Sequence, residues 1–142
     1  MIMSSIIESL RSYILTFPDL DENGCLNVDY LGNQAIEYSV EAVPCNPVYQ
    51  QYTDGGCIKQ FLFIFASREF YSADVNQCVE NLSFYENFAD WIHSNNRAGI
   101  LPDLDTGKEP VSIEVLTGGY AFDADSNTAR YQMQLRLLYE EE

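Results

Sequence analysis

The apolar run FLFIFA, residues 61–66, constrains the fold of this chain more than any other stretch of its sequence. Six consecutive apolar residues are short for a buried helix, and their aromatic and β-branched side chains favour an extended backbone. A strand without a polar face needs cover on both sides. The run therefore predicts a strand at the centre of a sheet, buried on both faces.

Alternation of apolar and polar residues predicts four further strands and one short edge piece. Gly32-Asn33 lies between the first two strands and marks a turn, so they are expected to form a hairpin with one wet face. The last strand is the longest and the best patterned. The predicted strands are residues 26–30, 36–40, 111–116 and 131–139, with 48–52 as the edge piece.

A first helix is predicted at the beginning of the chain. Ser5 followed by Glu8 resembles a capping box, and an apolar stripe continues from there to Phe17. Pro18 is expected to end this helix.

A second helical segment is predicted over residues 72–96, with Gly99 closing it. Ser83 with Glu86 forms another capping-box pattern, so the first part is a candidate for a separate short helix. A loop rich in Pro, Asp and Gly follows.

These elements predict one α+β domain over residues 1–142, in the order α-β-β-β-α-β-β. Short turns between neighbouring strands imply a mainly antiparallel sheet of about five strands, with the helices packed on one face.

The charge of the chain excludes several classes of partner. It carries 22 acidic and 7 basic side chains, a formal charge of −15, and the basic residues form no cluster. Proteins that hold phosphates need such clusters, so neither nucleic-acid binding nor adhesion to an anionic membrane is expected. No apolar run reaches the roughly 20 residues of a membrane span, and the beginning has no basic leader. A soluble intracellular domain is therefore expected.

The stretch DLDENGCLNVDY, residues 19–30, has most of the letters of a calcium-binding EF-hand loop. Such a loop takes its bidentate carboxylate from the twelfth position, where this chain has Tyr30. Asp, Asn and Gly also form ordinary turns, and a similar pattern recurs at 103–107 and 123–127. We therefore expect a turn that leads from the first helix into a strand, without a metal.

Few residues are candidates for catalysis. His93 is the only histidine, and as a general base it would need a partner such as Cys78, Asp90 or a serine placed by the fold. No nucleotide-binding, hydrolase or protease motif is present, so the sequence predicts no catalytic, cofactor-binding or metal residues and no small-molecule substrate. The cysteines lack the C-x-x-C spacing of zinc sites and are expected to be reduced thiols: Cys25, Cys45, Cys57 and Cys78.

Tyrosine is frequent in this chain, with ten residues beside eight phenylalanines. Several tyrosines fall in loops or on outer positions of the predicted strands, where an apolar ring with a polar tip suits a protein interface. Assembly with copies of itself is one interpretation, and plain core and edge packing is the other. The tyrosines in question are Tyr49, Tyr52, Tyr71 and Tyr120.

A series of short segments runs through most of the chain: NVDYLG (27–32), EYS (37–39), CNP (45–47), DGG (54–56), FASRE (65–69), FADW (88–91), GILP (99–102) and TARYQ (128–132). In content and order they resemble the small minor capsid proteins encoded in the head–tail joining region of phages and prophages of Gram-positive bacteria. The order of the segments carries the resemblance, since none is chemically diagnostic alone.

The resemblance implies a virion structural protein, similar in fold class to the tail terminators that cap the tail tube as a ring and connect it to the head. Such proteins have no catalytic residues. The implied partners are other copies of the chain, in a hexamer that would match the tail tube, and tail-tube or neck proteins. Assembly would take place in the cytoplasm of the bacterial host, and an acidic lumen would let DNA pass by repelling it.

Several alternatives stay open at this point. The role of terminator and that of another neck or capsid-joining protein are both compatible with the resemblance. A monomer in solution is compatible with assembly on a partner. The alternative function is a generic intracellular interaction domain, followed by a small enzyme built around His93.

Overall fold

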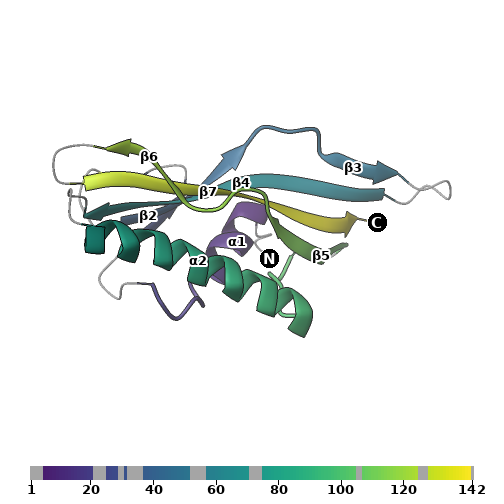
Figure 1. The fold of residues 1–142 in the computed structure, drawn as a ribbon. Coiled ribbons are helices and arrows are strands. Elements are labelled where there is room, and N and C mark those ends of the chain that lie inside the picture. Colours follow the sequence, from purple (N-terminus) through teal and green to yellow (C-terminus); the bar gives the residue numbers. More distant parts are fainter. Residues whose placement is uncertain are drawn as a thin grey trace.

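The computed structural model describes residues 5–20, 25–28, 31, 37–51, 57–70, 75–104, 107–124 and 128–141. Within these residues, two helices and seven strands form a single α+β domain with one mixed sheet (Figure 1). The elements are α1 (Ile6–Ile14), β1 (Cys25–Val28), β2 (Glu37–Val43), β3 (Val48–Gln51), β4 (Cys57–Phe70), α2 (Val75–Ala98), β5 (Lys108–Val115), β6 (Tyr120–Ala124) and β7 (Thr128–Glu141).

β4 and β7 form the centre of the sheet. Each has 14 residues, and they pair antiparallel along their whole length, from Cys57 opposite Glu141 to Phe70 opposite Thr128. β2 and β3 pair along the outer edge of β4, whereas β5 and β6 pair along the outer edge of β7. The FLFIFA run lies in the middle of β4, so its prediction as a central strand is confirmed.

Both helices lie on one side of the sheet, as predicted (Figure 1). Alternate residues of β4 and β7 point to that side, and Phe63, Phe65, Met133 and Leu135 are at most 1% exposed. Phe88 of α2 packs on them, with its ring centroid 4.5 Å from that of Phe65. Each side chain of this size contributes roughly 1.5–3 kcal/mol when fully buried, so this side supplies most of the stability.

α1 begins at its predicted cap and ends earlier than predicted. The Ser5 hydroxyl accepts a hydrogen bond from the Glu8 N–H at 3.2 Å. The helix ends at Ile14, because the next turn is tightened by a bond from the Phe17 N–H to the Ile14 oxygen at 2.9 Å. Phe17 remains part of the core at 4% exposure, since the tightened turn still directs it towards α2.

α2 ends at Gly99, as predicted. Gly99 has a φ of 75°, and its N–H bonds to the Asn96 oxygen at 3.3 Å. The next N–H, that of Ile100, bonds to the Asn95 oxygen at 2.8 Å. This pair of bonds is a Schellman motif, and the left-handed φ explains why the chain has glycine at this position. Neither of the two helices is long and apolar enough to cross a membrane.

The first two strands are parallel, which corrects the predicted hairpin. Leu26 lies opposite Tyr38 and Val28 opposite Val40, with both strands running in the same direction. Alternation predicts which side of a strand is buried, and it is identical for either direction of the strand. Residues 29–36 separate the strands, a connection longer than a common hairpin loop.

The sheet has seven strands in place of about five, so the predicted order is also corrected. The edge piece is β3. β6 is a further strand that was not predicted, because its sequence YAFDA has no clear alternation. β5 begins at Lys108, inside the predicted loop. It contains Pro110, which lies next to a shift in the pairing register between β5 and β7.

The predicted division of the second helix is wrong. α2 continues through Ser83 without a break. Asn81, on the turn before Ser83, is 3% exposed, so this part of the helix is held by buried contacts of its own. The helix therefore continues through the capping-box pattern of Ser83 and Glu86.

Candidate functional site

The side of the sheet that faces away from the helices is called the open face. Within the described residues no helix covers it (Figure 1). Leu62 and Ile64 point to this side and are only half-buried, which corrects the expectation of burial on both faces. Ser39, Ala66 and Gln132 form one row across β2, β4 and β7 and are nevertheless at most 5% exposed.

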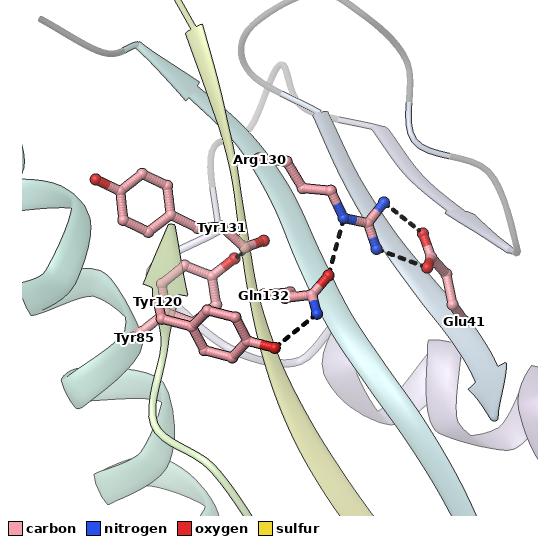
Figure 2. Close-up of polar contacts among 6 residues, drawn as sticks. All are labelled: Glu41, Tyr85, Tyr120, Arg130, Tyr131 and Gln132. Atoms are coloured by element: carbon pink, nitrogen blue, oxygen red, sulfur yellow. Dashed lines mark hydrogen bonds and ion pairs between the residues drawn. The ribbon is translucent and has the colours of Figure 1, made fainter. Parts of the chain in front are cut away.

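A series of polar side chains crosses the open face from β2 to β6 (Figure 2). Arg130 on β7 donates two hydrogen bonds to the carboxylate of Glu41 on β2, at 3.0 and 2.7 Å, and thus reaches across β4. Its Nε donates to Gln132 at 3.0 Å, and the Gln132 amide donates to the Tyr120 hydroxyl at 2.8 Å. The small side chain of Ala66 on β4 leaves room for the guanidinium. We call Glu41, Arg130, Gln132 and Tyr120 the cross-sheet chain.

Arg136, six residues further along β7, organises a second group of side chains on the open face. Its guanidinium donates to Glu114 of β5 through Nε at 3.0 Å and through Nη2, and Nη1 lies 3.5 Å from the Gln60 oxygen on β4. The ring of Tyr49 lies over the guanidinium carbon, with the centroid at 4.8 Å. Such a contact contributes about 0.5–1 kcal/mol at an exposed site. These four residues form the Arg136 cluster, which joins β3, β4, β7 and β5.

Most basic side chains of the protein serve its own fold. Arg130 and Arg136 are ion-paired, and the Lys59 ammonium lies 3.3 Å from Glu141. Arg11 donates to the main-chain oxygen of Leu26 at 2.8 Å. Four of the 7 basic residues are engaged in this way, against 22 acidic residues in the chain. A cation that is paired within the protein is poorly placed to release counterions from a phosphate backbone.

His93 and Cys78 are not brought together. Both lie on α2, and a separation of 15 positions corresponds to about 22 Å along a helix axis. His93 is exposed, and so is Asp90, one turn earlier on the same helix. The cysteines whose side chains the structure describes are half-buried and form no disulfide with one another: Cys45, Cys57 and Cys78.

The calcium-like stretch lies partly outside the described residues, which do not include 21–24 or Tyr30. β1 begins at Cys25, whose side chain is also outside, so the strand predicted after Gly24 is confirmed, whereas the turn predicted before it lies largely outside the described residues. In the part of the chain that is described, no group of three or more His, Cys, Asp or Glu side chains is placed to hold a metal ion. The similar loops 103–107 and 123–127 are likewise described only in part.

Two of the tyrosines that were expected on the surface are exposed. Tyr49 is 45% and Tyr120 37% exposed, and each belongs to one of the two polar groups on the open face. Tyr52 and Tyr71 lie outside the described residues.

Glu41, Arg130 and Arg136 were not predicted as residues of a functional site. A signal for the arginines was present in the last strand, whose polar positions carry side chains long enough to reach the neighbouring strands. The partner of each arginine depends on strand order, and Glu41 is two strands away from Arg130. The local sequence pattern therefore could not predict which acidic residue each arginine pairs with.

On the helical side of the same strands, the hydroxyl of Tyr85 fastens α2 to the sheet (Figure 2). It donates to the main-chain oxygen of Tyr131 at 3.0 Å, so the 2.5 Å bond between it and Ser67 is donated by the serine. Burial raises the pKa of Tyr85 well above its ordinary value of 10.0, and the bond from Ser67 opposes this less strongly. Gly119, in the connection between β5 and β6, lies so close to Tyr85 that a Cβ on this glycine would stand 2.3 Å from the Tyr85 side chain.

A pocket of about 450 Å³ opens between α1 and residues 100–103. Its lining includes the carboxylates of Glu8 and Asp103 and several hydroxyls, but neither histidine nor cysteine. The Tyr13 hydroxyl in this lining donates to the Ile100 oxygen at 2.9 Å and accepts from Asn95 at 3.0 Å. These bonds join α1, α2 and the following loop, so the hydroxyl has a structural role.

The open face is thus the part of the described surface that is best suited to recognition. Its tyrosine and arginine side chains are already held in place by hydrogen bonds and ion pairs, and both residue types are frequent at the energetic centres of protein interfaces. No protein-family model matches the chain, and no curated protein matches it either.

Proposed function

We propose that this chain is a structural protein of a phage virion, a tail-terminator-like ring subunit of the head–tail connection without catalysis. Its partners in this proposal are other copies of itself and tail-tube or neck proteins. The proposal rests on the ordered segments that resemble phage minor capsid proteins and on the properties of the open face.

The observation that carries the proposal is the position of three of those segments. Residues 37–39, 65–69 and 128–132 lie side by side in β2, β4 and β7. The third segment supplies Arg130 and Gln132 to the cross-sheet chain. Three of the eight segments that carry the resemblance are therefore neighbours in the sheet, and one of them supplies part of the preorganised polar network of the open face, as would suit a surface shared for assembly.

The charge of the protein supports the same proposal. A subunit of a head–tail channel must let DNA pass without retaining it, and a formal charge of −15 disfavours contact with phosphates. We propose that acidic side chains face the lumen of the ring. Electron microscopy of the assembled ring would test this, and a neutral or basic bore with the acidic residues on the outer rim would contradict it.

The function is tested on virions. Portal, major capsid and tail-tube genes are expected beside the gene for this chain, and mass spectrometry is expected to detect the chain in purified particles. Deletion of the gene is expected to leave separate heads and tails under the electron microscope, and a plasmid copy is expected to restore joined particles. Normal joining in its absence, or a chain that is found only in the host cytoplasm, would favour the generic interaction domain.

A further inference from the structure

Outside the central strand β4, two stretches of eight or more residues carry no charged residue, although charged residues make up 20% of the chain. The first covers residues 42–53 and the second residues 115–122. Both belong to the flanks of the β4–β7 pair. The first contains the connection from β2 to β3 and then β3, and the second contains the connection from β5 to β6 and most of β6.

Most described residues of these stretches are also exposed, and the others are half-buried. Residues 44–50, which we call the β3 edge segment, are exposed except for the half-buried Cys45. Val48 in this segment is 40% and Tyr49 45% exposed. Residues 116–121 form the β6 edge segment, in which Leu116 is 39% exposed and Tyr120 37%.

The two edge segments lie on the two opposite edges of the β4–β7 strand pair and at its opposite ends. β3 pairs with β4 near Cys57, whereas β6 pairs with β7 near Ala129, at the other end of the long strand pair. Figure 1 accordingly shows β3 and β6 at opposite ends of the sheet. A molecule with two different binding surfaces at opposite ends can join its copies head to tail. Such a contact forms a closed ring when the rotation between neighbouring copies brings the last copy back to the first.

Continuous pairing of strands between copies is blocked at these edges. β3 and β6 each contain a register shift, between Val48 and Gln50 and between Ala121 and Asp123. Pro47, immediately before β3, has no N–H to donate. Bulges and prolines at sheet edges prevent the addition of a further strand. A contact at these segments is therefore made by side chains.

We propose that the β6 edge segment of one copy docks on the β3 edge segment of a second copy. Two chains with a charge of −15 repel each other, and they approach most easily where neither carries charge. Val48 and Tyr49 on one side and Leu116 and Tyr120 on the other supply apolar and aromatic area for the contact. The inference rests on the proposed function in one respect. The proposed function supplies the ring, and the inference locates the contact between its subunits.

Two charge variants test the contact. Val48→Glu blocks the β3 edge segment and leaves the β6 edge segment intact, whereas Leu116→Glu does the reverse. Val48→Gln and Leu116→Gln are matched controls of similar size without the charge, and Leu82→Glu adds a charge at an exposed position of α2 (43% exposed). Mass is measured by native mass spectrometry and by light scattering after size exclusion, and circular dichroism checks that each variant is folded.

The wild type and the controls are expected to form oligomers at high protein concentration, more strongly as salt screens the repulsion. Each glutamate variant alone is expected to be a monomer. Their mixture is expected to form a one-to-one dimer and nothing larger, because each supplies the surface that the other lacks. Only a head-to-tail contact between two different surfaces gives this result.

A wild type that stays monomeric up to its solubility limit would overturn the inference. So would glutamate variants that assemble like the wild type, loss of assembly in Leu82→Glu, or a mixture that stays monomeric. These results are separable from the function. A chain that is present in virions but insensitive to both glutamates overturns the contact alone, and one that assembles but is absent from virions overturns the function alone.

Discussion

Arg130 of β7 and Glu41 of β2 form a two-point ion pair across the intervening strand β4, with N···O distances of 3.0 and 2.7 Å. Their side chains are 17% and 21% exposed. The pair therefore lies between a surface salt bridge and a fully buried one. It spans the open face at the point where no helix of the described chain provides cover.

The first prediction concerns this pair. Arg130→Ala is expected to lower the free energy of unfolding by about 2 kcal/mol, because it leaves the Glu41 carboxylate with little access to water and without its two donors. Arg130→Lys retains the charge but not the two parallel bonds, and is expected to lose about 1 kcal/mol. Urea unfolding followed by the fluorescence of Trp91, the only tryptophan, measures both.

A double-mutant cycle with Glu41→Ala isolates the interaction itself. We expect a coupling free energy of about 1 kcal/mol or more, and additive single effects would contradict the pairing.

A second prediction concerns the outer edge of β5, which is closed by a side chain of α2. The Asn96 amide donates to the Ile113 oxygen at 2.7 Å and accepts from the Ile113 N–H at 3.1 Å. Asn96→Ala is expected to lower the free energy of unfolding by about 2 kcal/mol and to accelerate hydrogen exchange at the Ile113 amide. Asn87→Ala, on the exposed side of the same helix, is the control and is expected to change stability by less than about 0.5 kcal/mol. Equal effects of the two substitutions would contradict the bridge.

The third prediction uses the two glycines between β5 and β6. A Cβ on Gly119 would stand 2.3 Å from Cβ and Cγ of Tyr85, whereas a Cβ on Gly118 would meet nothing within 4 Å. Gly119→Ala is therefore expected to cost about 1–3 kcal/mol through displacement of the connection or of α2. Gly118→Ala is expected to be close to neutral, and thermal unfolding of the two variants gives the comparison. An undisturbed Gly119→Ala would mean that this connection does not pack on Tyr85 as the structure has it.

Local signals predicted much of this fold. The FLFIFA run identified the central strand because a short apolar run with aromatic and β-branched side chains favours an extended backbone within a sheet, although its expected burial on both faces was wrong. Ser5 and Gly99 marked helix ends, since each satisfies main-chain groups that the helix leaves free. Tyr85, Phe88 and Ile92 lie at helical spacing within the second helix that was predicted, and all three are at most 1% exposed.

Features that depend on strand order were not predicted. Alternation is the same for parallel and antiparallel strands, so it predicted the strand that contains Leu26 and Val28 but not its parallel pairing with β2. The partners of Arg130 and of Arg136 come from distant parts of the sequence, and only the order β2-β4-β7-β5 brings them within reach. The exposed Tyr49 and Tyr120 were identified because tyrosine at an outer strand position is informative in itself.

The last prediction concerns the buried hydroxyl of Tyr85. At neutral pH, Tyr85→Phe is expected to cost about 1–2 kcal/mol, because the Ser67 hydroxyl and the Tyr131 oxygen both lose their partner.

The effect of this substitution depends on pH in a defined direction. Burial raises the pKa of Tyr85 in the folded protein well above the ordinary value of 10.0. Above pH 10 the unfolded chain releases this proton while the folded protein keeps it, so stability falls as pH rises, by at most about 1.4 kcal/mol per pH unit from this group. The contribution of this group to the free energy of unfolding is fully present below pH 10. It is lost as the pH rises towards the pKa of Tyr85 in the folded protein. Denaturant unfolding between pH 8 and 11 should therefore show a wild-type curve that falls more steeply above pH 10 than that of Tyr85→Phe, and parallel curves would mean that this hydroxyl ionises equally in both states.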